Sequence, residues 1–386
     1  MTQMTTKQRF LAAINGQKPD RLPVTTHHVM PYFLKKYLKG ADNMAFFKHF
    51  GLDAVHWLNP YKGNPSDSER FCGGNDPAAA YAIVSDNWRL ETEDIPGLDY
   101  PTRRYTFVTP KGRLSTVIQN NDYTMWVTEH LVKNKNDIEL IGEYATAPKC
   151  DLDALSREVD RYGENALIRG FVCGFDLFGQ PGTWQDAACL FGIEKLIMAT
   201  FDDPGWVKSF LDILFRRKQT FIRSLKGARY DILELGGGDA SSTVISPALF
   251  DAFVAPYDSR LIEEAHKAGQ KIAYHTCGGM MPILNNIKAM GTDAMETFTP
   301  VGMGGDVDIK KARDILGPEM CMIGGFDQQH FFTECTPQQT RAEVRRCFQA
   351  AGKEGAFILC PSDHFFDAEP ELIMAFADEA QKCVYA

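Results

Sequence analysis

The sequence predicts an α/β fold: a (β/α)8 TIM barrel with an antiparallel insertion after the second strand. From about residue 165 onward, six short apolar segments alternate with amphipathic segments of helical period. Two further apolar segments lie near the N-terminus, which brings the number of predicted strands to eight. Eight strands alternating with helices favour a closed barrel over an open doubly wound sheet, and no strand–GxGxxG–helix signature supports the open alternative.

The predicted strands and helix boundaries follow from local sequence signals. The strands are expected at residues 22–26, 53–57, 166–172, 231–235, 271–275, 294–298, 320–324 and 356–359. A first helix is expected after Thr5, because Gln8 stands three residues on, as in a capping box. Three later helices are expected to begin where a capping residue precedes a proline, at 203–204, 246–247 and 336–337, and Gly269, Gly291 and Gly352 stand where helices are expected to end.

Residues 60–150 have a different pattern, and we interpret them as an insertion within a single domain of residues 1–386. Strand-like segments occur at 81–84, 105–108, 114–119 and 124–132, and the Pro110-Lys111-Gly112 sequence is typical of a hairpin turn. No low-complexity linker flanks this part of the chain.

The composition excludes some classes of function. With 386 residues, 44% of them hydrophobic, the chain is long enough for a large buried core. A net charge of −9 argues against nucleic acid as the main partner, since phosphate binding needs a basic face. No apolar run approaches the ~20 residues of a membrane span, and the polar N-terminus does not resemble a signal peptide. We therefore expect a cytoplasmic protein whose ten cysteines are free thiols, most of them buried.

The active site of a barrel lies at the carboxyl ends of its strands, and the strand expected at 271–275 ends in His275 and Cys277. Residues two apart in an extended chain point to the same side, so both side chains can approach one point. Imidazole and thiolate together are typical zinc ligands. The alternative is a core histidine beside an inert buried cysteine.

Three other residues near the last strand and one in the middle of the barrel are further candidates. Cys360, Asp363 and His364 follow the strand at 356–359 and supply a thiol, a carboxylate and an imidazole at the same rim. Glu234 stands inside an apolar strand, where a carboxylate is costly unless it is paired or binds a metal. Each also has a structural alternative: a small core residue for Cys360, a turn former for Asp363, and a buried ion pair for Glu234.

Four weaker candidates stand at the same predicted rim. Asp327 follows the strand at 320–324, and we assign it to orienting a substrate or ligand, or else to capping the next turn. His27 and His28 follow the first strand, and Asp176 follows the third.

The order of several motifs resembles the uroporphyrinogen decarboxylase superfamily over nearly the whole chain. Residues 15–24 resemble the opening of that family, and residues 246–257 resemble its helix after the fourth strand. Residues 275–278, 305–308 and 324–327 resemble its later strand ends. The resemblance implies the TIM-barrel fold.

Within the superfamily, the chain resembles the zinc-dependent corrinoid methyltransferases more than the decarboxylases. The decarboxylases carry an arginine-rich segment after the first strand that binds the acidic porphyrinogen, whereas residues 25–31 here contain no arginine. The methyltransferases hold zinc with a His-x-Cys pair and a distant cysteine, and His275 and Cys277 match that pair.

The third ligand departs from the family pattern. Counted back without a gap from Pro370, the position of the family cysteine falls on Asp363, and Cys360 lies three residues earlier. The expected zinc ligands are therefore His275, Cys277 and Cys360, with Asp363, His364 or Glu234 as alternatives.

The resemblance implies transfer of a methyl group between a small methylated substrate, or a thiol, and the cobalt of a corrinoid (cobalamin), free or on a partner corrinoid-binding protein. Zinc would either favour a thiolate that attacks methyl–cobalt or polarise a methylated atom for attack by reduced cobalt. The altered third ligand favours the second direction, with Glu234 and Asp327 as the predicted catalytic residues. The alternatives are a decarboxylase of the same fold and a non-catalytic relative.

Overall fold

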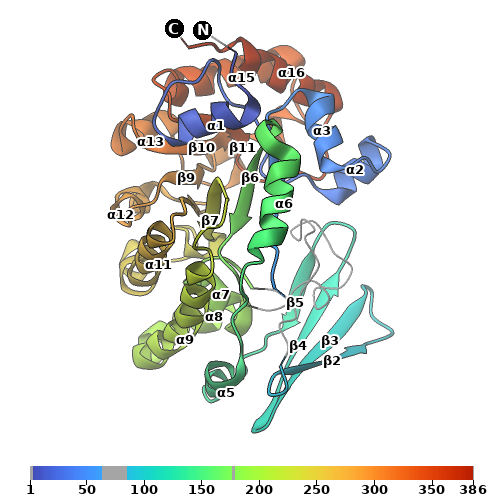
Figure 1. Cartoon of the computed structure of the whole chain (residues 1–386), viewed down its shortest axis with the longest axis vertical. Helices are drawn as coiled ribbons and strands as arrows, with labels where there is room; N and C mark the ends of the chain where they lie inside the picture. The colour runs from blue at the N-terminus through green and yellow to red at the C-terminus, as the bar shows by residue number, and fades with distance from the viewer. Residues whose placement is uncertain (1–2, 63–84, 176–178, 386) are drawn as a thin grey trace.

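The computed structural model describes residues 3–62, 85–175 and 179–385, and its centre is a curled parallel sheet of seven strands (Figure 1). The strand order is β1-β6-β7-β8-β9-β10-β11, and all pairs are parallel. The strands are β1 (Ala54–Trp57), β6 (Ala166–Phe171), β7 (Ile232–Gly236), β8 (Ile272–His275), β9 (Ala294–Thr297), β10 (Cys321–Phe326) and β11 (Phe357–Pro361). Seven of the eight predicted barrel strands are therefore present.

The predicted first strand is a bridging segment between the two edges of this sheet. On one side, the Leu359 amide of β11 donates to the Pro23 carbonyl (2.9 Å), and the Leu359 carbonyl accepts from Thr25 (3.0 Å). On the other side, the Asp53 amide before β1 donates to the Val24 carbonyl (2.8 Å). The proline nitrogen cannot donate to a ladder, which helps to explain why this segment forms single bridges and no regular strand.

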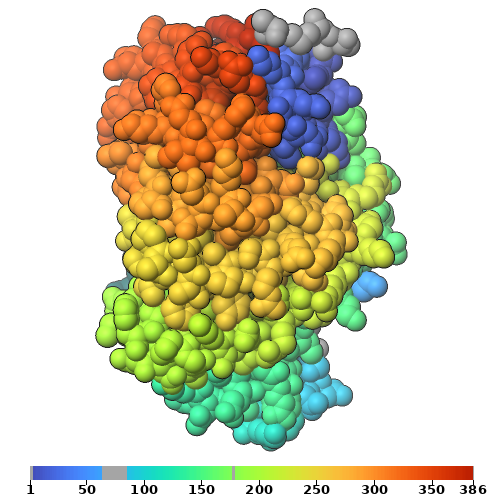
Figure 2. All heavy atoms as spheres, turned by 90° about the vertical axis from the view of Figure 1, so that its left-hand side faces the viewer, coloured from blue at the N-terminus to red at the C-terminus, as the bar shows by residue number. Residues whose placement is uncertain are grey.

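Helices connect the strands, so the α/β class is confirmed and the architecture is TIM-barrel-like. The helices are α1 (Thr6–Ile14), α2 (Pro31–Tyr37), α3 (Asn43–Phe50), α5 (Asp137–Tyr144), α6 (Leu152–Tyr162), α7 (Thr183–Phe191), α8 (Ile193–Asp202), α9 (Pro204–Arg223), α10 (Pro247–Leu249), α11 (Ala255–Lys267), α12 (Leu284–Ala289), α13 (Ile309–Leu316), α14 (Gln328–Phe331), α15 (Pro337–Cys347) and α16 (Pro370–Lys382). Figure 2 shows the face on which the segments from about residue 200 to 350 follow one another up the molecule, as expected for successive strand–helix units.

The predicted helix boundaries agree closely with the structure. Thr5 and Gln8 form the expected capping box of α1. Asp203, Ser246 and Thr336 cap the helices that begin at the following prolines. These local signals succeeded because each side-chain oxygen satisfies a backbone N–H that the first helical turn leaves unpaired.

A second, four-stranded antiparallel sheet lies between β1 and β6 in the chain and stands at the lower right of Figure 1. Its strands are β2 (Arg89–Asp94), β3 (Thr102–Thr109), β4 (Gly112–Asn120) and β5 (Met125–Glu129). The hairpin between β3 and β4 turns at Pro110 and Lys111 as predicted. β2 escaped prediction because its Arg-Leu-Glu-Thr-Glu-Asp sequence has little apolar alternation and its side chains are mostly exposed. The strand expected at 81–84 lies outside the described residues, and the assignment of 60–150 as an insertion in one domain stays a prediction.

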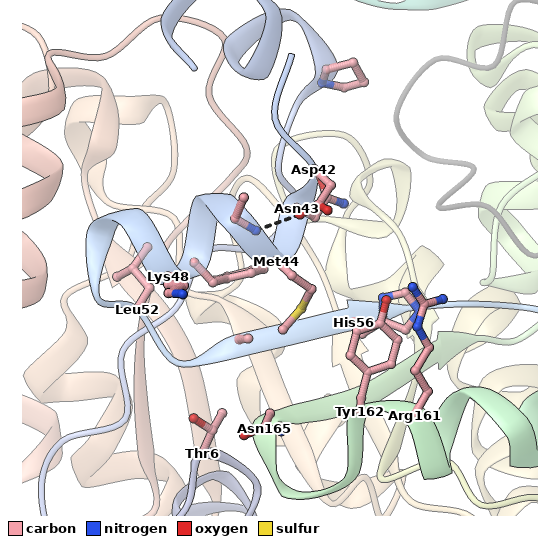
Figure 3. Close-up of a pocket in the computed structure, with 14 residues that line it drawn as sticks. Thr6, Asp42, Asn43, Met44, Lys48, Leu52, His56, Arg161, Tyr162 and Asn165 are labelled. Atoms are coloured by element: carbon pink, nitrogen blue, oxygen red, sulfur yellow. Dashed lines mark hydrogen bonds between the residues drawn. The ribbon is translucent and has the colours of Figure 1, made fainter. Parts of the chain in front are cut away.

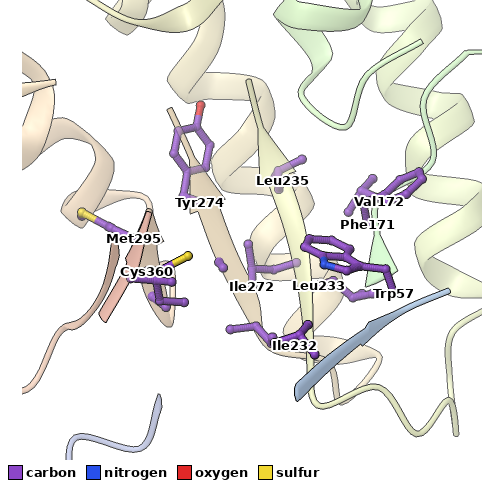
Figure 4. Close-up of a cluster of buried hydrophobic side chains, with 14 of the residues drawn as sticks. Trp57, Phe171, Val172, Ile232, Leu233, Leu235, Ile272, Tyr274, Met295 and Cys360 are labelled. Carbon is purple, nitrogen blue, oxygen red and sulfur yellow. The ribbon is translucent and has the colours of Figure 1, made fainter. Parts of the chain in front are cut away.

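The strands of the parallel sheet are buried on both faces, since helices cover the outside and side chains fill the inside. Figure 4 shows buried side chains of both faces. Trp57 of β1 faces the inside, whereas Leu233 of β7 and Met295 of β9 stand next to Glu234 and Glu296 and face the helices. This packing excludes water from the charged groups described below.

A cavity of about 1030 Å³ lies outside the parallel sheet, between α3, β1 and α6 (Figure 3). His56 of β1 lines it, whereas its neighbour Trp57 is buried on the other side, because successive side chains of a strand face opposite sides. The His56 ring packs on Tyr162, with 4.0 Å between centroids. The lining contains none of the residues predicted to be catalytic.

Within the described residues, no helix is long and apolar enough to cross a membrane. The nine cysteines of the described part of the chain are all free thiols, and six of them are buried.

A buried ion-pair network holds the bridging segment to β1. Asp53 is 2% exposed and accepts hydrogen bonds from Arg9 (2.7 Å), from Arg21 (2.9 Å) and from the Val24 amide (3.0 Å). Arg9 also pairs with Asp20 (2.7 Å). The network therefore joins α1, the bridging segment and β1.

We predict that Asp53→Asn lowers the free energy of unfolding by about 3–5 kcal/mol, because it removes one partner of a buried charge network. Urea denaturation checks this. Asp94→Asn is the matched control, since the Asp94–Arg103 pair is exposed and such pairs contribute little. Equal effects of the two substitutions would contradict a structural role for the network.

Candidate active site

Four charged or titratable side chains meet inside the parallel sheet, each from one of four neighbouring strands. Arg169 comes from β6, Glu234 from β7, His275 from the end of β8 and Glu296 from β9. His27, which follows the bridging segment, completes the cluster. We call these five residues the central cluster. All except His275 are at most 6% exposed.

Glycines let the strands approach one another closely at the ends that carry the cluster. Gly236, at the end of β7, has φ +109°, and a Cβ there would lie 2.3 Å from the His275 carbonyl oxygen. Gly324 of β10 has φ +125°, and a Cβ would lie 1.9 Å from the Thr297 carbonyl oxygen. A side chain at either position would push β7 from β8 or β10 from β9 and so disturb the cluster.

The cluster is held by short polar contacts. The His275 Nδ1 atom lies 3.1 Å from Glu296 Oε1 and 3.8 Å from Glu234 Oε2. His27 Nε2 lies 3.7 Å from Glu234 Oε2. The Arg169 guanidinium donates to Glu234 (3.3 Å) and to Glu296.

Burial and neighbouring charges shift the titration of these groups in different directions. Burial lowers the pKa of His27 to about 3, so this imidazole is neutral and has a free nitrogen lone pair. Burial also works against a charged His275, but Glu234, Cys277 and Glu296 outweigh it and raise the His275 pKa well above its ordinary value.

The pKa values of the two carboxyl groups, Glu234 and Glu296, are shifted in opposite directions. Burial raises the pKa of Glu234 to about 7. Burial also opposes ionisation of Glu296, but the charge of Arg169 and the hydrogen bond from His275 outweigh it and hold the Glu296 pKa well below its ordinary value. Two carboxylates in one dry site do not ionise equally, because each charge opposes the other.

Four members of the cluster, His27, Glu234, His275 and Glu296, form a metal-ligand constellation. One ligand atom from each lies within 4.8 Å of the others. Two imidazoles and two carboxylates are a donor set that Zn²⁺ accepts. In a tetrahedral zinc site, the ligand atoms are about 3.4 Å apart, so these side chains would have to draw together by about 1 Å. The four side chains therefore supply the kinds of donor atom that a divalent metal needs, in one buried place.

Of the predicted metal ligands, the structure brings His275 and Glu234 together but leaves both cysteines outside the four-residue set. Cys277 contacts the His275 ring, and its sulfur packs against the backbone of Gly238. Cys360 is 2% exposed in β11 and lies among apolar side chains (Figure 4). Burial, followed by the charge of Glu296, raises the Cys360 pKa well above its ordinary value, so it is a neutral thiol here.

Other predicted residues have contacts of their own. Asp363 pairs with His364 at 2.8 Å. Burial alone would raise the Asp363 pKa, but the contact with His364 outweighs burial and lowers the pKa to about 2. Asp327 caps α14 by accepting from the His330 amide (3.0 Å), which was the structural alternative for this residue. The His28 ring packs on Trp57, with 4.5 Å between centroids. Asp176 lies outside the described residues.

Sequence reasoning missed Arg169 and Glu296 and gave little weight to His27. The signal that singled out Glu234, a charged residue inside an apolar strand, also applies to Arg169 in Ala-Leu-Ile-Arg-Gly-Phe and to Glu296 in Ala-Met-Glu-Thr. Applied to every strand, it would have found three of the five members of the central cluster.

The model of the uroporphyrinogen decarboxylase (URO-D) family matches residues 152–383, which is more than half of the chain. The chain belongs to this family.

Individual relatives carry two different activities. A methylated-thiol–coenzyme M methyltransferase of Methanosarcina mazei is 28% identical over 163 residues, 42% of this chain and 41% of that protein. A uroporphyrinogen decarboxylase of Gloeobacter violaceus is 29% identical over 220 residues, 53% of this chain and 55% of that protein. The matches thus span between two fifths and just over half of these relatives' lengths.

A solved structure, a methyltransferase from Methanosarcina mazei, has the same fold over almost its whole length. The TM-score is 0.65 at 15% identity, and the match covers 98% of this chain and 99% of that chain. At this identity the likeness shows the fold.

We predict that Glu296→Gln lowers the free energy of unfolding by about 3–5 kcal/mol at pH 7, because it leaves the buried Arg169 without its strongest partner. Glu234→Gln is the matched control and is expected to cost less, since glutamine resembles the neutral carboxyl that Glu234 forms near its pKa of about 7. Urea denaturation of both variants measures the difference, and equal losses would contradict this charge assignment.

The same assignment predicts a pH dependence. The Glu234 pKa is raised on folding from 4.5 to about 7, so its contribution to stability is fully present below about pH 4.5 and is lost as the pH rises through 7. In a urea denaturation series between pH 4.5 and 7.5, Glu234→Gln should remove a stability loss that the unaltered protein shows. A slope that survives the substitution would assign the titration to another group.

Proposed function

We propose that this protein is a methyltransferase that moves a methyl group between a small methylated substrate, or a thiol, and the cobalt of a corrinoid. The corrinoid (cobalamin) is free or carried by a partner corrinoid-binding protein. The observation that carries the proposal is the buried set of two imidazoles and two carboxylates inside the curled sheet of a URO-D-family protein. The Methanosarcina mazei relative, named as acting on methylated thiols, supports this class of reaction.

We propose zinc as the metal of this site, where it would supply a Lewis acid that polarises the methylated atom or favours a thiolate. His27 contributes a neutral imidazole, since burial keeps it unprotonated. If zinc is held by His275 and the cysteines, Glu296 orients His275 through its 3.1 Å contact with Nδ1, as carboxylates commonly do for metal-binding histidines. The apolar interior excludes water and so strengthens each of these interactions.

For the direction of transfer we favour demethylation of the substrate. The bond from the methyl carbon to its oxygen, nitrogen or sulfur breaks, and its electron pair stays on that atom. The electron pair of the new bond to the methyl carbon would come from a reduced corrinoid acting as methyl acceptor. If zinc is held by His275 and the cysteines, Glu234 stays free to give the proton that the released atom takes up, because its pKa of about 7 suits a general acid near neutral pH. We assign Asp327 to holding the turn after β10 by its cap.

Two sets of zinc ligands share His275. One is His27, Glu234, His275 and Glu296, which the structure brings within 4.8 Å. The other is the thiolate set expected from the family resemblance, which contains Cys277 and Cys360. Asp363 and His364 stay alternatives to Cys360.

We predict about one zinc per chain in protein purified without oxygen, measured by elemental analysis. His275→Ala should abolish it under either ligand set, and His266→Ala, an exposed histidine on α11, should leave it unchanged. If Glu234→Gln loses zinc while Cys277→Ser and Cys360→Ser keep it, the ligands are the carboxylate set. If the two cysteine variants lose zinc while Glu234→Gln keeps it, the ligands are the thiolate set. Folded protein that takes up no zinc would contradict the zinc proposal.

We also predict that the protein exchanges a methyl group with a corrinoid. Methylcobalamin with a thiol, or cob(I)alamin with small methyl ethers, amines and thioethers, should show the absorbance change of cobalt methylation or demethylation. His275→Ala should reduce the rate by about 100-fold or more, since loss of Lewis-acid assistance costs several kcal/mol, and His266→Ala should not. If zinc-loaded protein exchanges no methyl group with a corrinoid in either direction, the methyltransferase proposal is wrong. The decarboxylase and the non-catalytic relative would then be the favoured alternatives.

A further inference from the structure

We propose that Arg169 is a built-in cation of the central cluster, which occupies the position between Glu234 and Glu296 and thereby limits how tightly the cluster holds a divalent metal. The inference rests on the proposed function only in taking His27, Glu234, His275 and Glu296 as metal ligands.

The geometry places the guanidinium on the carboxylate oxygens that lie nearest to the two histidines of the cluster. Arg169 Nη2 lies 3.3 Å from Glu234 Oε2 and also bonds Glu296 Oε1. Those two oxygens are also the ones nearest to the histidines: Glu296 Oε1 faces His275, and Glu234 Oε2 faces both His275 and His27. A metal ion bound by the four ligands therefore competes with Arg169 for the same lone pairs.

The burial of the cluster makes this competition strong. Arg169 is 4% exposed, Glu234 4% and Glu296 1%, so little solvent screens their charges. Within a few ångströms, a guanidinium repels a divalent cation far more in such a site than at the surface. An arginine also stays charged at any ordinary pH, so this repulsion cannot be removed by losing a proton.

Trp57 holds the guanidinium in this position. The Arg169 Cζ atom lies 4.3 Å from the centroid of the Trp57 ring, which is a cation–π contact. The indole is itself fixed, because its Nε1–H donates to the His27 carbonyl at 2.9 Å. The stacked arginine is therefore part of the architecture of the site.

The ion pairs leave two buried polar atoms of the cluster without a hydrogen bond. Within the described residues, Glu296 Oε2 and Arg169 Nε are buried and have no hydrogen-bond partner. A buried polar atom without a partner is costly, and native sites usually satisfy such atoms with a bound ion, ligand or water. The unused oxygen of Glu296 gives an entering cation a first point of attachment while Arg169 still bonds the other oxygen.

The test is the affinity for Co²⁺, followed by its visible absorption, at pH 8 so that protons compete little. Arg169→Met removes the charge and keeps much of the volume, and Arg169→Gln is a second neutral variant in case the first does not fold. Arg169→Lys is the matched control that keeps a cation. All are made in a background that carries both Cys277→Ser and Cys360→Ser, so that the absorption reports nitrogen and oxygen ligands. Circular dichroism checks folding.

We expect the dissociation constant of the neutral variants to fall by about tenfold or more relative to the Arg169 parent, and that of Arg169→Lys to stay within a fewfold. If the folded neutral variants bind Co²⁺ no more tightly than the parent, the proposal is wrong. Arg169 would then serve to position the metal ligands. Absence of Co²⁺ binding in parent and variants alike would overturn it as well. Tighter binding in protein that never exchanges a methyl group would uphold the role of Arg169 while the methyltransferase proposal fails.

Discussion

Two glutamates buried inside a sheet need cations, and this requirement organises the centre of the molecule. Glu234 of β7 and Glu296 of β9 stand on either side of β8, and both are buried. Arg169 and His275 lie against them, and each contact is short enough to offset part of the desolvation of the charges. The apolar residues around the cluster then strengthen the same attractions, because they lower the local dielectric.

The strand order explains why these residues meet. β6, β7, β8 and β9 are consecutive in the parallel sheet, and each supplies one residue of the cluster. In the strand register, Glu234 lies two positions beyond Arg169 and His275 two positions beyond Glu234, whereas His275 and Glu296 are paired directly. The bridging segment adds His27 from the far end of the sequence, and the Asp53 network fixes that segment to β1. The site therefore depends on the curl of the sheet as much as on the residues themselves.

The fold and the relatives limit the chemistry without naming a substrate. Family membership rests on more than half of the chain, whereas the individual relatives match it over only part of their lengths and include both methyltransferases and decarboxylases. The central cluster, whose neutral His27 and paired carboxylates suit a metal ion, is the feature that favours our proposal of methyl transfer. Arg169 adds a property of this chain: a cation already bound where the metal would sit.

The sequence by itself determined the α/β class, most strands and helix caps, the family resemblance and the place of His275 and Glu234 at the strand ends. These depend on short-range rules, namely side-chain period, capping and the cost of a charge in an apolar strand. Only the tertiary structure decided that Arg169, Glu296 and His27 join them, and that Cys277 and Cys360 stand outside the four-ligand set. The reason is physical: which side chains share a buried point depends on the curl and stagger of strands far apart in the chain, and no local pattern encodes it.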